Sequence, residues 1–198
     1  MQGFAFAAAP WLRLLFWLSF ASWLAIELAI WSRDRAKVKG RREDRFSVLA
    51  IGASIWAASA LAFNAPRIWP AAGIAASPFL LAGAGIVLIW TGIVFRLWAV
   101  RTLGRFFRVT VTVQDDHRLV DTGPYARLRN PSYTGAVVTM AGVGLAIGHW
   151  LSLAAMALIP LLGFAWRIRV EEASLAARFG ADYETYRSRR WALVPPLW

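Results

Sequence analysis

Residues 117–135 read HRLVDTGPYARLRNPSYTG, a polar and arginine-rich stretch that stands between long apolar blocks. Gly123-Pro124 marks a turn, and Asn130-Pro131 marks a second one, because a residue before proline is biased away from the helical region. A helix is therefore predicted to begin near Pro131, where free backbone N–H groups and the positive end of the helix dipole suit an anionic group. This stretch separates an apolar first part of the chain from a mixed second part.

The composition is that of a polytopic membrane protein. Of the 198 residues, 59% are hydrophobic, 12 are tryptophan and only 17% are charged, whereas about a quarter are charged in an ordinary soluble domain. Long uncharged blocks alternate with basic clusters. The net charge of +11 does not indicate a nucleic-acid partner, because the basic residues flank apolar runs instead of lining one face.

Five apolar segments are predicted to cross the membrane, which makes the fold class an all-α integral membrane protein. They run approximately Pro10–Trp31, Phe46–Phe63, Pro78–Val100, Tyr133–Ile147 and Trp150–Trp166. A spanning helix needs roughly 20 apolar residues, so the fourth segment is short. We expect it to start earlier, inside the turn at Pro131, or to be partly shielded by protein.

Lysine and arginine are concentrated on one side of these segments. The loop Ser32–Arg45 holds seven, Arg101–Arg129 holds six and the tail from Arg167 holds six, whereas the loop between the second and third segments holds only Arg67. By the positive-inside rule the basic regions face the cytoplasm. The chain is compact in the bacterial manner, so we expect a multi-pass protein of an inner (plasma) membrane with its site facing the cytoplasm and its N-terminus outside.

Three charged residues lie within the predicted spans: Arg13, Glu27 and Arg96. Intramembrane charges are costly and often functional. All three lie near span ends. Arg13 can snorkel to the interface, Glu27 can snorkel or pair there, and Arg96 can contact phosphate headgroups as readily as substrate. Their role is left open by the sequence.

Glycines 83, 85, 142 and 144 are predicted to allow close helix packing in lipid. They do not follow a strand within a βαβ unit, so they do not indicate a nucleotide-binding loop. A second possibility for Gly142 and Gly144 is that the missing side chain leaves room for a cofactor.

Further polar motifs follow the apolar hairpin. Arg167-Ile168-Arg169-Val170-Glu171-Glu172 ends the fifth segment, and Phe179-Gly180-Ala181-Asp182-Tyr183-Glu184-Thr185-Tyr186 continues as an amphipathic C-terminal helix that is interrupted near Gly180. Arg167 and Glu171 are four residues apart, so they lie on one helix face and can pair.

With residues 117–135, these motifs resemble the isoprenylcysteine carboxyl methyltransferase family within the phospholipid methyltransferase-like superfamily. The family elements are matched in order and spacing by His117-Arg118-Leu119-Val120, Gly123-Pro124-Tyr125, Arg129-Asn130-Pro131-Ser132-Tyr133-Thr134-Gly135 and the two motifs above, from about Leu103 to Tyr186. The resemblance implies an integral membrane methyltransferase that uses S-adenosylmethionine and releases S-adenosylhomocysteine. We expect one domain over residues 1–198, with 1–100 as a membrane scaffold and 101–198 as the catalytic half.

The resemblance also implies which residues surround the cofactor. They are His117, Leu119, Val120, Gly123, Pro124, Tyr125, Arg129, Pro131, Tyr133, Glu171 and Glu172. Glu171 or Glu172 can pair with the cofactor ammonium or ribose hydroxyls, and Tyr125 or Tyr133 can stack on or hydrogen-bond the adenosine. For His117 a structural hydrogen bond is an equal alternative, and the tail can instead be a membrane-surface helix.

Methyl transfer to a carboxylate requires alignment and a cation, but no base, because the acceptor is already ionised. We expect Arg167 or Arg129 to supply that cation and Glu171 to hold the arginine or the cofactor. The expected substrate is a lipophilic, isoprenylcysteine-like molecule that enters from the bilayer. The related alternative is a phospholipid or amine N-methyltransferase, in which Glu171 or Glu172 accepts a proton.

Other classes are less well matched. An NADPH-dependent sterol-type reductase carries a similar turn but generally more spans, and a non-catalytic membrane partner has no need of these motifs in this order.

Asn130 stands where the family has histidine, and an amide cannot become cationic or shuttle a proton. No metal is expected, because the chain has no cysteine and its two histidines, His117 and His149, lie far apart. Arg105–Gln114 is predicted to be an extended connector.

Overall fold

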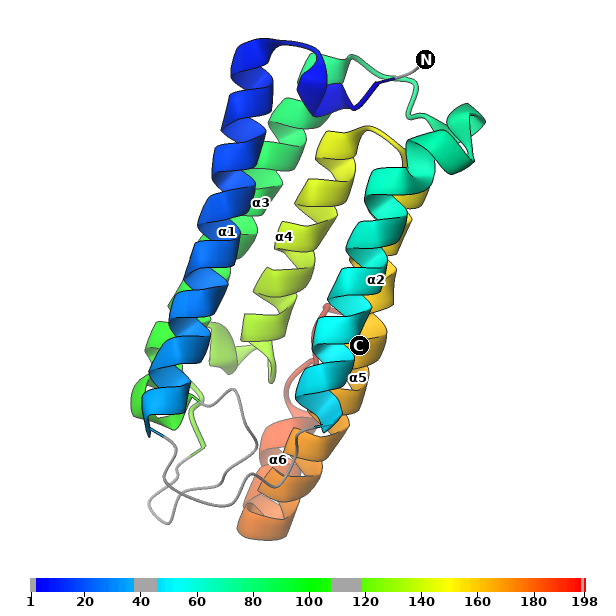
Figure 1. Ribbon diagram of the computed structural model, residues 1–198. Helices are drawn as coiled ribbons and strands as arrows, with labels where there is room; N and C mark the ends of the chain where they lie inside the picture. Colours follow the sequence, from blue (N-terminus) through cyan, green and yellow to red (C-terminus); the bar gives the residue numbers. More distant parts are fainter. Residues whose placement is uncertain (1–2, 38–45, 108–118, 197) are drawn as a thin grey trace.

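The computed structural model describes residues 3–37, 46–107, 119–196 and 198. Within these residues the chain forms a bundle of long helices, shown in Figure 1. The helices are α1 (Pro10–Lys37), α2 (Phe46–Ile68), α3 (Pro78–Leu103), α4 (Pro131–Ile147) and α5 (Trp150–Phe179), followed by the short α6 (Ala181–Ser188). Short 3₁₀ turns are η1 (Ala5–Ala7), η2 (Pro70–Ala72), η3 (Gly104–Phe106) and η4 (Gly123–Ala126).

The helix α4 is enclosed by the others. It packs between α3 and α5, while α1 covers α3 and α2 covers α5. Four helices, α1, α2, α3 and α5, are long and apolar enough to cross a membrane, and α4 is shorter, with 17 residues. The expectation for the fourth segment is therefore confirmed in both respects, since α4 begins at Pro131 and is shielded by protein. A fifth crossing by α4 stays a prediction.

Glycines bring α3, α4 and α5 into backbone contact. A Cβ atom on Gly142 would lie 2.6 Å from the backbone nitrogen of Ile89, and one on Gly144 would lie 2.7 Å from the backbone of α5. Gly85 is equally close to α4, so the packing prediction is confirmed for these three. It is wrong for Gly83, which has nothing within 4 Å. Neighbouring helices fill the space beside Gly142 and Gly144, so the idea that this space holds a cofactor is also wrong.

The outer surface of the bundle is apolar. Large exposed side chains face outwards from α1, α2, α3 and α5, as expected of a surface in contact with lipid tails. They include Trp11, Leu14, Leu18, Leu28, Leu49, Trp56, Leu80, Val87, Val94, Leu158 and Leu162.

The two ends of the bundle differ. At the end that is uppermost in Figure 1, the α4–α5 turn is closed by backbone contacts: Nε2 of buried His149 lies 2.9 Å from the carbonyl oxygen of Trp69, and the amide of Ile74 donates to the carbonyl of Gly148 at 3.0 Å. At the opposite end lie the last turns of α1, α3 and α5 and the first turns of α2 and α4. The described parts of the three basic regions thus share one end, while the side of the membrane that this end faces stays a prediction.

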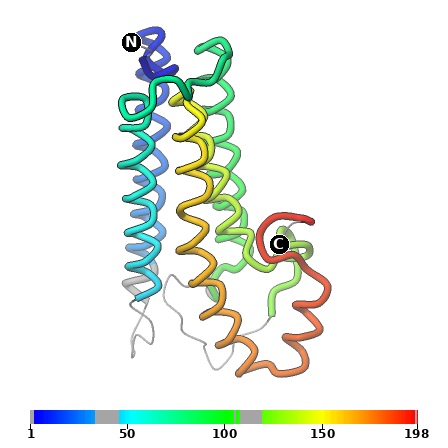
Figure 2. The backbone as a smooth tube through the Cα atoms, turned by 90° about the vertical axis from the view of Figure 1, so that its right-hand side faces the viewer, coloured from blue at the N-terminus to red at the C-terminus, as the bar shows by residue number. Residues whose placement is uncertain are grey.

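The chain beyond α5 folds back on itself. Gly180 has a φ of +53°, a conformation that favours glycine, and it separates α5 from α6. The predicted interruption of the tail helix is therefore confirmed. Figure 2 shows the C-terminal segment returning beside the chain that leads into α4. The predicted connector begins with η3 instead of an extended strand, and its residues from 108 onwards lie outside the described residues.

Candidate active site

Arg129 and Tyr133 lie on either side of the N-cap residue of α4. Asn130 is the N-cap residue, and its carbonyl oxygen accepts from the amides of Tyr133 at 3.0 Å and Thr134 at 3.2 Å. These two amides are therefore bonded within the turn, and the binding of an anionic group at the start of α4 stays a prediction. The helix starts where the sequence predicts.

A first cluster forms around Glu171, and we call it the Glu171 cluster. Oε1 of Glu171 accepts from the hydroxyl of Tyr133 at 3.0 Å and from Nε of Arg167 at 2.7 Å. Arg167, with 1% of its side chain exposed, also donates to the hydroxyl of Ser47 on α2 at 2.9 Å. The ring of Tyr133 stacks on Phe164 at 5.0 Å. The predicted Arg167–Glu171 pair is confirmed, and Arg167 is enclosed by protein.

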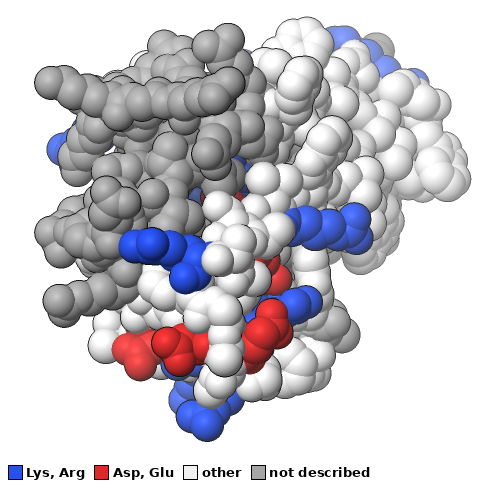
Figure 3. All heavy atoms as spheres, turned by 90° about the horizontal axis from the view of Figure 1, so that it is seen from below, with Lys and Arg blue, Asp and Glu red and all other residues white. Residues whose placement is uncertain are grey.

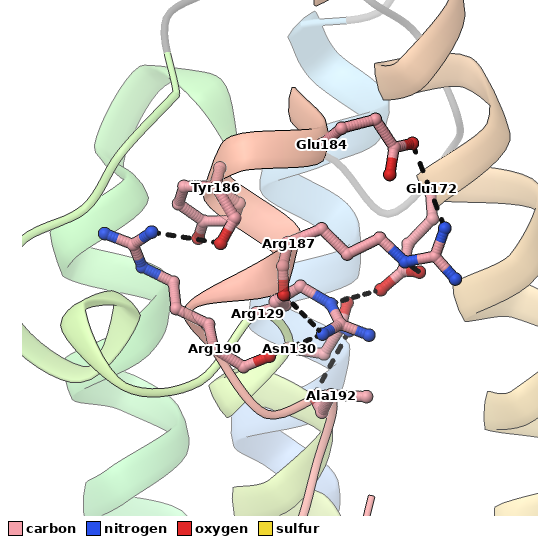
Figure 4. A network of polar contacts seen from close by, with 8 residues as sticks. All are labelled: Arg129, Asn130, Glu172, Glu184, Tyr186, Arg187, Arg190 and Ala192. Carbon is pink, nitrogen blue, oxygen red and sulfur yellow. Dashed lines mark hydrogen bonds and ion pairs between the residues drawn. The ribbon is translucent and has the colours of Figure 1, made fainter. Parts of the chain in front are cut away.

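A second cluster forms around Glu172, and Figure 4 shows it. Oε1 of Glu172 accepts from Nε of Arg129 at 2.8 Å, and Oε2 lies 3.7 Å from Nε of Arg187 on α6. Nη1 of Arg129 donates to the carbonyl oxygens of Arg190 at 2.5 Å and Arg187 at 3.2 Å. We call this the Glu172 cluster. Neighbouring glutamates thus bind different arginines, one inside the bundle and one against the returning tail.

The C-terminal segment supplies contacts that the sequence did not predict. Arg190 donates to the carbonyl of Tyr125 at 2.9 Å, and its guanidinium lies 4.1 Å above the ring of Tyr186. The amide of Arg129 donates to the carbonyl of Trp191 at 2.8 Å, and the side chain of Asn130 donates to the carbonyl of Ala192 at 3.3 Å. Most of these acceptors are backbone oxygens, and a backbone oxygen is present at every residue, so the sequence cannot indicate which one is used. The one hint in the sequence was the pair Arg189-Arg190, whose side chains need acceptors.

This end of the molecule is charged on its surface and buries its tyrosines. Figure 3 looks onto it and shows acidic side chains in a row, with lysine or arginine side chains around them. Burial raises the pKa of Tyr125 and of Tyr183 well above the usual value, and it raises the pKa of Tyr186 to about 12. The three phenols therefore remain neutral hydrogen-bonding groups at physiological pH.

The remaining predicted site residues lie on the segment that leads into α4. Leu119 and Val120 are half-buried, Pro124 and Tyr125 are buried in η4, and Gly123 has a φ of +56°. Pro131 is buried at the start of α4, and His117 lies outside the described residues.

The described residues offer carboxylates and phenols rather than a metal centre. Within the described ranges, no group of three His, Asp or Glu side chains is placed to hold a metal ion. The hydrogen bonds from Tyr133 and from Nε of Arg167 fall on Oε1 of Glu171, and 22% of this side chain is exposed, so we consider its second oxygen, Oε2. That oxygen is an acceptor suited to an ammonium or a hydroxyl group of a ligand.

The chain is similar in sequence to known membrane methyltransferases. A family model described as phospholipid methyltransferase matches residues 81–182, a little over half of the 198 residues. A probable protein-S-isoprenylcysteine O-methyltransferase of Oryza sativa subsp. indica is 34% identical over 113 residues, which are 56% of this chain and 59% of that protein. A protein-S-isoprenylcysteine O-methyltransferase of Schizosaccharomyces pombe is 39% identical over 80 residues, which are 40% of this chain and 34% of that protein.

A solved structure shares the fold. It is that of the eukaryotic intramembrane Ras methyltransferase, an isoprenylcysteine carboxyl methyltransferase, which matches with a TM-score of 0.58 and 26% identity over 78% of this chain and 54% of that one. The chain thus spans less than two thirds of the length of these relatives. The resemblance predicted from the motifs is confirmed, and the chain is an integral membrane protein.

Proposed function

Because the chain belongs to the phospholipid methyltransferase family, we propose that it methylates the carboxylate of a lipophilic, isoprenylcysteine-like molecule with S-adenosylmethionine as the donor. The observation that carries this proposal is the meeting of two distant segments at one end of the bundle. Tyr133 contacts Glu171 at 3.0 Å, and Arg129 contacts Glu172 at 2.8 Å. A pocket for a water-soluble donor beside the lipid phase requires such a meeting.

The residues of the two clusters fit this cofactor. Glu171 offers Oε2 to the ammonium or a ribose hydroxyl, and Tyr125 offers an aromatic ring for the adenosine. When bound, S-adenosylmethionine supplies a methyl group on a sulfonium that departs as a neutral thioether. We assign cofactor contacts to Leu119, Val120, Gly123, Pro124 and Pro131 as well, because they lie before η4, within it and at the first residue of α4, on the segment that leads to Tyr133.

The chain's own residues then orient the reactants. Only 1% of the Arg167 side chain is exposed, so we give it a positioning role: it holds the carboxylate of Glu171 in place. Arg129 is partly exposed and is the better candidate for the cation that faces the substrate carboxylate. Glu172 then sets the direction of the Arg129 guanidinium.

The ion pairs favour a carboxylate acceptor over an amine. An ammonium group must lose a proton before it can accept a methyl group, whereas a carboxylate need not. Glu171 and Glu172 each neutralise an arginine, so neither can take up that proton without breaking an ion pair. The family model's description keeps a phospholipid N-methyltransferase as the second candidate. We place either activity on the cytoplasmic side of the inner membrane, where the basic end lies under the positive-inside rule.

Labelled methyl transfer in detergent tests this function. The purified protein is incubated with methyl-labelled S-adenosylmethionine and S-farnesylated N-acetylcysteine, and the matched control is the same thioether with its carboxyl group amidated. We expect label on the free acid only, in a form that mild base releases as methanol, because the product is an ester. Saturable heat on titration with S-adenosylhomocysteine measures cofactor binding separately.

Two outcomes contradict the proposal. Absence of saturable S-adenosylhomocysteine binding overturns both methyltransferase candidates. Base-stable label on phosphatidylethanolamine, with none on the farnesylated acid, replaces the carboxylate acceptor with an amine.

A further inference from the structure

A continuous path of polar contacts crosses the bundle at the level of the Glu171 cluster. It joins one side chain or more from each of α1, α2, α3, α4 and α5, and we call it the polar belt. Its members are Glu27, Arg96, Ser132, Tyr133, Glu171, Arg167 and Ser47. The α1 and α2 residues of the belt lie outside the region that the family model matches.

Arg96 is the junction of the belt on α3. Its Nη2 donates to Oε2 of Glu27 at 2.7 Å, and its Nε lies 2.5 Å from Oε1, so the two groups form a two-pronged ion pair between α1 and α3. Its Nη1 donates to both the carbonyl oxygen of Ser132 at 3.0 Å and the hydroxyl at 2.7 Å. Only 12% of the Arg96 side chain and 28% of that of Glu27 are exposed. This pairing differs from both alternatives that the sequence left open for Arg96, headgroups and substrate, because the guanidinium is directed at protein groups.

The belt reaches Glu171 through consecutive residues of α4. Ser132, held by Arg96, directly precedes Tyr133, whose hydroxyl donates to Glu171. A guanidinium holds its donors in a fixed planar fork, so Arg96 can bond a carboxylate and a serine in one rigid arrangement that the ammonium of a lysine does not reproduce. The position of the first turn of α4 is therefore tied to α1. At the other side of the Glu171 cluster, the hydroxyl of Ser47 on α2 accepts a hydrogen bond from Arg167.

We propose that Glu27 and Arg96 are positioning residues for the active site: they fix the first turn of α4 and, through Tyr133, the carboxylate of Glu171. Neither residue needs to touch cofactor or substrate for this role. Residues that direct a ligand-binding group through one intermediate are often as important as the group itself. The apolar first part of the chain thereby contributes to the chemistry and is more than a scaffold.

Hydrogen–deuterium exchange on the detergent-solubilised protein tests the first step of this proposal. In Glu27→Gln and in Arg96→Lys, we expect the amides of Tyr133 and Thr134 to exchange about tenfold faster, since members of one polar network are coupled by this order of magnitude. The amides of residues 145–148 at the opposite end serve as an internal reference and should be unchanged. Arg13→Gln is the matched control, because it removes an intramembrane charge from α1 at a residue outside the belt.

S-adenosylhomocysteine affinity tests the second step, and only this readout rests on the proposed function. We expect both belt variants to bind it about tenfold more weakly and Arg13→Gln to bind it like the unmodified protein. Unchanged exchange at Tyr133, or equal acceleration at both ends of α4, overturns the positioning role. If the unmodified protein binds no S-adenosylhomocysteine, the proposed function fails, while the exchange result still decides whether Glu27 and Arg96 fix α4.

Discussion

At both ends of the bundle the polar groups beside the helix turns are paired, but their partners differ. At the end with His149, a buried imidazole and backbone amides bond to backbone carbonyls, and the turn is short. At the end with Glu171 and Glu172, charged side chains bond to one another and to the returning tail. At the His149 end the polar groups only connect the helices. At the glutamate end there are more charged side chains than such connections need.

This difference between the two ends indicates where function is concentrated. Buried polar groups are normally satisfied wherever they occur, so satisfaction alone does not mark a site. Ion pairs are costly to assemble in a low-dielectric region, and their accumulation at one end calls for a reason beyond stability.

The largest effect is expected for Glu171→Gln. The amide cannot match the charge of Arg167, which is enclosed, and it can present an N–H group to Tyr133 and Arg167. Breaking such a pair is strongly destabilising to the local geometry, so we expect methyl transfer to fall about 100-fold. The rate of labelled ester formation measures this. The control is Glu184→Gln, a 61% exposed carboxylate 3.9 Å from Arg187, which should retain its rate.

A smaller effect is expected for Arg129→Lys. An ammonium cannot bond to Glu172 and to two tail carbonyls in one planar arrangement, so the tail loses an anchor. We expect cofactor affinity to fall about tenfold and proteolysis after Arg189 or Arg190 to accelerate. Calorimetric titration and timed trypsin digestion provide the measurements. Arg127→Lys, at an exposed residue on the same segment, is the control; an equal change there would contradict the specific role of Arg129.

A pH titration sharpens the contrast through the tyrosines. Burial raises the pKa of Tyr186 to about 12, above the usual value near 10, and raises those of Tyr125 and Tyr183 as well. A raised folded-state pKa means stability that is complete below pH 10 and is lost as pH rises through the folded-state value. Ultraviolet absorbance of phenolate should show Tyr186 titrating near pH 12, and Tyr186→Phe should remove that step. If the absorbance transition of Tyr186 instead occurred near pH 10, the phenol would be exposed to solvent, and the packing described for the charged end would be contradicted.

The smallest effect is expected for His149→Gln. Glutamine keeps a donor for the carbonyl of Trp69, so the free energy of unfolding should fall by about 1 kcal/mol or less. Methyl transfer should be unchanged, because His149 caps the start of α5 and the two glutamates lie near the other end of that helix. A thermal melt in detergent and the ester assay measure the two quantities. A large loss of transfer with an intact melt would break the proposed division between the ends.

Much of the fold follows from local rules. Apolar runs, the basic clusters and the proline at 131 predict the helices and the start of α4, and a residue pair four apart predicts Arg167–Glu171. Gly180 gives the break between α5 and α6 because only glycine readily adopts its positive φ.

Long-range partner choice does not follow from such rules. Glu171 and Glu172 are adjacent and chemically identical, and only the packing of α5 against α2 and α4 directs one to Arg167 and the other to Arg129. The sequence suggested phosphate headgroups or substrate as partners of Arg96, and the tertiary fold instead pairs it with Glu27 and Ser132. The role of Asn130 was also hidden: its amide serves the tail by bonding to Ala192.

The pairing of Trp191 and Ala192 with Arg129 and Asn130 has a consequence for biosynthesis. Translation delivers the apolar helices to the bilayer well before it delivers these residues. Until they emerge, the chain leading into α4 lacks the backbone partners that hold it, so this short peptide docks onto a bundle that is already inserted. A nascent chain stalled before Arg190 would accordingly be embedded without the backbone partners of Arg129 and Asn130.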